Sequence, residues 1–149
     1  MKIAAKTQYG LRFMVVLGAQ YGRRIVQLRE IAEKEKVSEK YLEQIVRILK
    51  TQKLVKAQRG SQGGYTLTRD PKKITLKDII EVLEGSLTPV DCFEKDNICE
   101  LKELCVTIDI WKKFAKHIKN FFENITLEQL VQSYNKKHKV CKTKKEVPV

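Results

Sequence analysis

The stretch from residue 38 to residue 67 constrains the fold most, because its hydrophobic pattern changes period once. The first part, "SEKYLEQIVRILK", repeats apolar residues at i, i+3, i+4 and i+7, the spacing of one buried helix face. The second part, "LVKAQRGSQGGYTL", alternates apolar and polar residues on both sides of a glycine-rich tip. That alternation predicts a β-hairpin. The stretch is therefore expected to form a helix followed directly by a hairpin.

A short helix is predicted just before this stretch, from about Leu28 to Lys36. The turn between the two helices is tight, and Ser38 is a good N-cap for the second one. Two short helices joined in this way fit a helix-turn-helix, and the hairpin that follows would be its wing. The wing-tip glycines Gly60, Gly63 and Gly64 allow positive φ there.

Two further helices are expected to complete the first half of the chain. The first begins at a cap on Thr7 and runs to about Tyr21. The second is "ITLKDIIEVLEG", in which Thr75 and Asp78 form a capping box and Gly85 ends the helix.

A long helix is predicted from about Leu104 to Asn124, and a capping box at Thr126 opens a short one that ends near Tyr134. The long helix has a heptad-like apolar stripe, which suits either a partner helix or packing against its own domain. We assign to a dimer interface the stripe residues Ile108, Trp111, Ala115, Ile118 and Phe122. Residues 135–149 are expected to be a flexible basic tail.

Basic residues dominate the two ends of the chain but not its middle. The net charge is +12. Residues 1–84 hold 18 Lys and Arg against 9 Asp and Glu, whereas residues 85–135 hold 6 against 8. A cationic surface favours nucleic acid or an anionic membrane, although a basic surface can also serve solubility alone. No apolar run reaches the roughly 18 residues of a membrane span, and no signal peptide is apparent, so we expect a cytoplasmic protein.

Three cysteines lie within the slightly acidic middle segment, in "CFEKDNICELKELC". Thiolates are soft ligands that suit iron–sulfur clusters and zinc. Structural zinc sites usually contain a closer cysteine pair than the C-x6-C-x5-C spacing found here, so zinc ranks second. A thiol switch or unligated thiols remain open, and no base that would activate a nucleophile is evident nearby. The chain is accordingly not expected to be an enzyme.

The fragments "YGLRFMVVL", "SEKYLEQIVRILKTQKLVKAQRGSQGGYTL", "ITLKDIIEVLEG" and "ITLEQL" resemble winged-helix regulators of the IscR, NsrR and CymR type. The likeness extends from Met1 to about Tyr134. It implies a mainly α protein with a winged helix-turn-helix domain (1–85), a cysteine-containing cluster-binding loop (86–106), a dimerisation helix with a short closing helix (104–134) and a basic tail (135–149). It also implies a homodimer, acting as a repressor on near-palindromic promoter DNA.

The resemblance assigns roles to particular residues. The wing and recognition-helix residues expected at DNA are Ser38, Lys40, Tyr41, Glu43, Gln44, Arg59, Gly60, Gly63 and Gly64. An iron–sulfur cluster, 2Fe–2S or 4Fe–4S, is expected on Cys92, Cys99 and Cys105.

The fourth ligand of such a cluster is open. The position of the IscR-like histidine holds Ile108, and that of the NsrR-like aspartate holds Gln8. The other candidates are Asp91, Asp109, Cys141, Gln8 from a partner subunit or a non-protein ligand. The alternative implied by the family is a cluster-free or zinc-binding regulator of the CymR kind, acting through a partner protein or a thiol switch.

Overall fold

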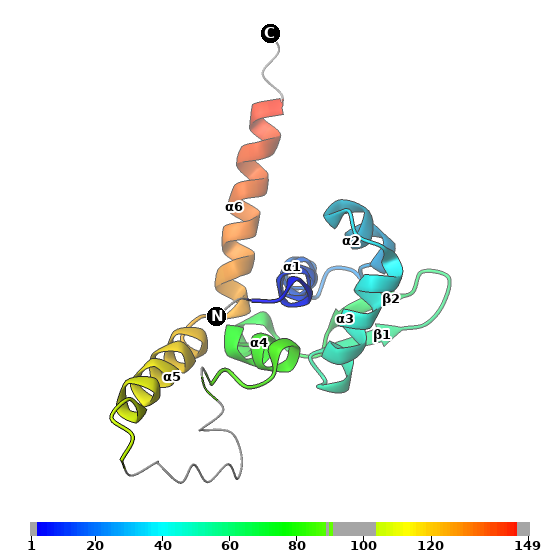
Figure 1. Ribbon diagram of the computed structural model, residues 1–149. Helices are drawn as coiled ribbons and strands as arrows, with labels where there is room; N and C mark the ends of the chain where they lie inside the picture. The colour runs from blue at the N-terminus through cyan, green and yellow to red at the C-terminus, as the bar shows by residue number, and fades with distance from the viewer. Residues whose placement is uncertain (1–2, 89, 91–103, 146–149) are drawn as a thin grey trace.

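The computed structural model describes residues 3–88, 90 and 104–145, with side chains described as far as residue 139. Helices predominate in these ranges, and the strands form a single antiparallel hairpin. In chain order the elements are α1 (Ala5–Ala19), α2 (Leu28–Glu35), α3 (Glu39–Thr51), β1 (Val55–Gln58), β2 (Gly64–Leu67), the 3-10 turn η1 (Pro71–Lys73), α4 (Leu76–Glu84), α5 (Ile108–Glu123) and α6 (Leu127–Lys145). In Figure 1, α3 and the hairpin lie on one side of the molecule and α5 on the other.

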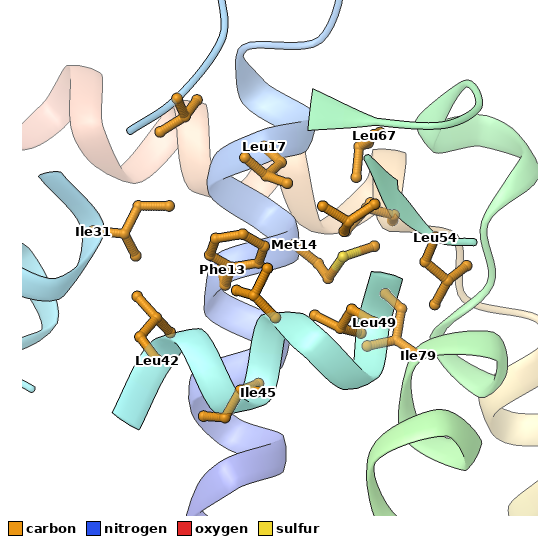
Figure 2. Close-up of a cluster of buried hydrophobic side chains, with 14 of the residues drawn as sticks. Phe13, Met14, Leu17, Ile31, Leu42, Ile45, Leu49, Leu54, Leu67 and Ile79 are labelled. Atoms are coloured by element: carbon orange, nitrogen blue, oxygen red, sulfur yellow. The ribbon is translucent and has the colours of Figure 1, made fainter. Parts of the chain in front are cut away.

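The hydrophobic core is built around α1, whose residues Phe13, Met14 and Leu17 are almost completely buried. Side chains from α2, α3, the hairpin, α4 and the start of α6 close around this helix (Figure 2). The predicted apolar stripe of α3 lies inside this core. Burying one such side chain contributes about 1.5–3 kcal/mol, so these residues fix α3 and the wing against α1.

The predicted caps of α3 and α4 are confirmed. Thr75 Oγ1 accepts a hydrogen bond from the Asp78 N–H at 3.1 Å, and the Asp78 carboxylate accepts one from the Thr75 N–H at 2.9 Å. Gly85 ends α4 with a φ of 93°, a conformation that glycine adopts without strain. These bonds satisfy backbone groups that a helix end would otherwise leave unpaired.

The start of α1 differs from the prediction, because Thr7 is not its N-cap. The helix begins at Ala5, and the N–H of Ala4 donates to Glu84 Oε1 at 2.7 Å. Thr7 is buried within the first turn, and its hydroxyl has no hydrogen-bond partner among the described residues. A carboxylate from α4, distant in sequence, therefore holds this helix end.

The end of the chain also differs from the prediction, because α6 does not stop near Tyr134. It continues to Lys145, so residues 135–145 are helical rather than part of a flexible tail. This extension contains no glycine or proline and is rich in lysine, which has good helix propensity. The helix rises past α1 in Figure 1.

A short backbone ladder joins α4 to the α5–α6 junction. The N–H of Leu76 donates to the Ile125 carbonyl at 2.7 Å, and the N–H of Leu127 donates to the Ile74 carbonyl at 2.8 Å. Leu127 is fully buried, so α6 starts inside the core. By contrast α5, which begins at Ile108 rather than Leu104, has no buried residue within the described chain.

Candidate nucleic-acid interface and cysteine segment

The N-cap of α3 fixes where this helix begins, and its buried apolar stripe determines which face is exposed. Lys36 takes a left-handed conformation after α2, and Ser38 Oγ then accepts a hydrogen bond from the Tyr41 N–H at 3.1 Å. Because the opposite face of α3 packs in the core, Lys40, Glu43 and Gln44 are exposed. Such side chains can reach base edges if α3 enters a major groove.

The wing glycines act through two different physical constraints. Gly60 has a φ of 123°, as predicted for the tip of the hairpin. Gly63 and Gly64 do not adopt the positive φ that glycine allows, and they are instead required for space. A Cβ at Gly63 would lie 2.4 Å from the Gln58 carbonyl oxygen, and a Cβ at Gly64 would lie 2.4 Å from the Val26 carbonyl oxygen.

The wing is tied to the segment before α2. Val26 and Tyr65 exchange two backbone hydrogen bonds, of 3.1 and 2.8 Å. The strand register pairs Val55 with Leu67 and Gln58 with Gly64. The Val26–Tyr65 bonds therefore hold the wing beside the start of α2.

An open groove of about 770 Å³ runs between α3 and the wing, and we call it the α3–wing groove. It brings together four of the residues predicted to contact DNA, namely Lys40, Glu43, Gly63 and Gly64. It also includes Gln27, Arg29 and Tyr65, which the sequence patterns did not single out. The α2–α3 turn and the Val26–Tyr65 bridge bring these three residues to the groove. Their spacing in the sequence therefore did not predict that they line it.

The remaining predicted DNA-binding residues lie outside the lining of this groove. Gln44 and Arg59 are exposed, on α3 and at the wing tip. Ser38 caps α3, as described above. Tyr41 is half-buried and packs edge-to-face on Tyr9, with 6.0 Å between ring centroids. Tyr41 therefore packs against the core, and core packing is the alternative to the predicted DNA contact for this side chain.

The charges in the α3–wing groove are mixed. Arg29 and Lys40 line it together with Glu39 and Glu43, and Arg29 forms an ion pair with Glu33 at 2.8 Å. Burial, together with the nearby Glu43 and Glu39, raises the pKa of the Tyr65 hydroxyl, which stays protonated as a donor. Donors and acceptors side by side suit recognition of base edges better than a uniformly cationic surface would.

Of the three clustered cysteines, only Cys105 lies within the described residues; Cys92 and Cys99 fall outside them. Cys105 is half-buried just before α5, with its Sγ 3.4 Å from Thr107 Oγ1. Hydrogen bonds from the side chain and backbone of Thr107 hold the pKa of the Cys105 thiol below its usual range. A thiol that ionises readily is suited to metal ligation, because the thiolate is the ligand.

The positions considered for a fourth ligand differ in their surroundings. Gln8 is exposed on α1, and its amide donates to the Ile3 carbonyl at 3.4 Å. Asp109 is exposed and lies 3.8 Å from Lys112, while the backbone of Cys141 is within α6. In the part of the chain that the structure describes, no three His, Cys, Asp or Glu side chains converge on a common point. Because Cys92 and Cys99 are outside that part, the predicted cluster site stays a prediction.

The outer face of α5 carries more apolar surface than the predicted stripe. Ile108, Ala115, Ile118 and Phe122 are half-buried and Trp111 is 37% exposed. Three further apolar residues are exposed beside them, namely Ile110, Phe114 and Phe121. Their spacing of four and seven residues places them on one helix face, next to the predicted stripe. Whether this face forms a dimer interface stays a prediction.

The described helices include none that is both long and apolar enough to cross a membrane.

Comparison with known proteins gives consistent matches over most of the chain. The model of the Rrf2 family, described as iron-dependent transcriptional regulators, matches residues 3–133. The transcriptional regulator CymR of Bacillus subtilis is 38% identical over 130 residues, which cover 87% of this chain and 89% of CymR. The regulator IscR of Sodalis glossinidius is 32% identical over 133 residues, covering 89% and 80% of the two chains.

Two solved structures have a similar fold and similar identity. The structure of CymR, the global cysteine regulator of B. subtilis, matches with a TM-score of 0.73 and 36% identity, covering 89% of this chain and 98% of that one. The structure of T. potens IscR matches with a TM-score of 0.72 and 37% identity, covering 90% and 88%. The winged-helix fold expected from the sequence is confirmed by these neighbours, but CymR-like and IscR-like proteins are equally near.

Proposed function

Because the chain belongs to the Rrf2 family of transcriptional regulators, which are not enzymes, we propose that it is a homodimeric repressor of promoter DNA in the bacterial cytoplasm. The observation that carries this proposal is the α3–wing groove, where exposed polar residues of α3 lie beside the wing. In a helix-turn-helix protein the second helix enters the major groove, and here that helix is α3.

The chemistry of the exposed groups divides them into two roles. Glu43 can accept a hydrogen bond from the amino group of cytosine, and Gln44 can bond both edge atoms of adenine. Arg59 at the wing tip is suited to a minor groove, whereas Arg29 and Lys40 are suited to phosphates. Specificity would therefore arise from Glu43 and Gln44, and affinity from the cations.

Replacing Gln44 with alanine is expected to relax base preference by about 1–3 kcal/mol at one position in each half-site. Arg59→Ala should weaken binding, and affinity should fall steeply with salt, by a slope of about −0.9 per neutralised phosphate. Gln52→Ala, an exposed glutamine at the other end of α3, is the matched control. Selection of sites from random DNA followed by footprinting would measure these effects.

A specific regulator should protect two half-sites about one helical turn apart. The proposal fails if binding shows no sequence preference, or if Gln44→Ala weakens all DNA sequences equally. The Gln52→Ala control should bind like the unmodified protein.

For the cysteine segment we propose an iron–sulfur cluster on Cys92, Cys99 and Cys105. Support comes from the ionisable Cys105 thiol and from the family's description as iron-dependent regulators. The cluster would supply a redox- or iron-responsive group adjoining α5. A coupling of about 1–3 kcal/mol between cluster and DNA would be enough for a useful switch.

A second candidate is a cluster-free or zinc-binding regulator of the CymR kind, acting through a partner protein or a thiol switch. Two observations favour it. The identity to B. subtilis CymR is as high as that to IscR proteins. In addition, Gln8 and Ile108 occupy the positions where related cluster-binding proteins are expected to have a fourth ligand.

Anaerobic purification distinguishes the two candidates. The cluster proposal expects a brown protein containing iron and sulfide, whose visible absorption is lost in each of Cys92→Ala, Cys99→Ala and Cys105→Ala. Cys141→Ala is the control and should keep most of the colour. A colourless, iron-free protein contradicts the cluster, and tightly bound zinc supports the second candidate. If Cys141→Ala removes the colour, α6 supplies the fourth ligand.

A further inference from the structure

A second groove, which shares no residue with the α3–wing groove, lies between α1, α2 and α6. Its volume is about 360 Å³, within the range of small-molecule sites. Leu11, Val15 and Val16 of α1 and Leu130 of α6 provide apolar walls. All four are only partly buried, so the groove offers accessible hydrocarbon surface.

Cationic groups gather at the lip of this groove. Its lining includes the cations Arg12, Lys34 and Lys137 against the single carboxylate of Glu35. Glu35 is already occupied, because its carboxylate lies 2.7 Å from Arg12 Nη1. The lip therefore has an excess of positive charge beside an apolar wall.

Lys34 is the cation whose surroundings point most clearly to a ligand. Its ammonium donates to the Tyr134 hydroxyl, lies 3.2 Å from His138 Nε2 and is 4.6 Å from the centre of the Tyr134 ring. Neither partner is a carboxylate, and no carboxylate within the described ranges forms an ion pair with Lys34. An ammonium has three donors, so one remains for an incoming acceptor.

The neighbouring side chains hold Lys34 in place. The rings of Tyr134 and His138 stack with centroids 3.9 Å apart, and His138 Nδ1 lies 3.0 Å from the Tyr134 carbonyl oxygen. When Nδ1 donates to that carbonyl, Nε2 is free to accept from Lys34. The ammonium is thus positioned by α6 at the end of the apolar walls.

We propose that this groove binds a small amphipathic carboxylate. The hydrocarbon body would lie between α1 and α6, and the carboxylate would pair with Lys34 and provide the counter-charge that the described surroundings lack. This inference goes beyond DNA binding and depends neither on the cysteines nor on a DNA site. Direct binding to the full-length protein therefore tests it independently.

Isothermal titration calorimetry with octanoate and with 1-octanol separates the contribution of the carboxylate to affinity from that of the hydrocarbon chain. Octanoate should bind at least about tenfold more tightly, because a hydrogen bond to a charged group is worth at least that factor. Lys34→Gln should remove this preference by weakening octanoate while leaving octanol unchanged. Arg29→Gln removes a cation from α2 outside the groove and should leave both affinities unchanged.

A variant that fills the groove tests whether octanoate and octanol bind at this place. Ser133 is exposed on α6 at the groove lining, so Ser133→Trp should fill the space without disturbing the core and should abolish binding of both ligands. Circular dichroism would verify that the variant keeps its helices. The proposal is overturned if neither ligand binds the unmodified protein, if octanol binds as tightly as octanoate, or if binding survives in folded Ser133→Trp.

Discussion

At the residue scale, Gly64 shows how little space the wing leaves for a side chain. The Val26–Tyr65 bridge draws the backbone of Val26 against the start of β2, so any Cβ at position 64 would contact it. Gly64→Ala is therefore expected to lower the free energy of unfolding by about 1–3 kcal/mol, the usual cost of overpacking. Urea denaturation measures this, with Ser61→Ala at the exposed wing tip as the control. Equal stability of the two variants would contradict the close approach.

At the scale of elements, one ion pair supplements the backbone ladder between α4 and α5. Lys77 Nζ lies 2.6 Å from Glu123 Oε1, and Glu81 approaches the same ammonium at 4.0 Å. The hydrogen bond raises the pKa of Lys77 and lowers that of Glu123. Because α5 has no buried residue in the described chain, we infer that this pair helps to set its direction.

Breaking that pair should lower the thermal denaturation midpoint slightly in both Lys77→Glu and Glu123→Lys. The double exchange should restore only part of the loss, since a carboxylate introduced at position 77 would still repel Glu81.

The pH dependence of this contribution follows from the lowered pKa of Glu123. The stabilisation is fully present above the ordinary pKa of a glutamate, about 4.3, and is lost as the pH falls through the lower pKa of Glu123 in the folded protein. The difference between variants and parent should therefore persist at neutral pH and disappear in acid, where Glu123 is protonated. The raised pKa of Lys77 means that the pair is also lost in strong base, as the pH rises through the folded pKa of the ammonium. Exchanging Asp109 with Lys112, a pair within α5, should not affect the α4–α5 connection.

At the scale of the whole molecule, the apolar face of α5 needs a covering surface. Ile110 and Phe121 are more than 60% exposed, and with Trp111 and Phe114 they form one side of the helix. Two copies pairing through this side would place their α3 helices at the outer ends of the dimer, since α3 and α5 lie on opposite sides of the chain (Figure 1). This arrangement suits two half-sites on DNA.

Phe114→Asp is accordingly expected to convert the dimer to a monomer, because it would bury an unpaired charge in the interface. Sedimentation velocity at micromolar concentration would measure the change. Lys116→Asp lies on the opposite side of α5, since successive residues are about 100° apart, and should remain dimeric. A monomeric parent protein, or a dimeric Phe114→Asp variant, would contradict the interface.

The sequence by itself determined those elements whose causes lie within a few residues. The α3 stripe, the Ser38 cap, the Thr75–Asp78 capping box and the alternating hairpin each follow from local spacing, and the structure contains them all. The cysteine cluster and the DNA contacts were inferred from residue chemistry and family resemblance. Such inference identifies candidate residues, but it does not show which of them lie together.

Only the tertiary structure decided features that depend on contacts between distant segments. The Glu84 carboxylate sets the start of α1, the Tyr9 ring draws Tyr41 into the core, and the Val26 backbone explains Gly64. Arg29 and Tyr65 line the α3–wing groove because contacts between distant segments bring α2 beside the wing. Periodicity and capping encode which face of an element is apolar and where it ends, whereas close approach between elements depends on how the whole core packs.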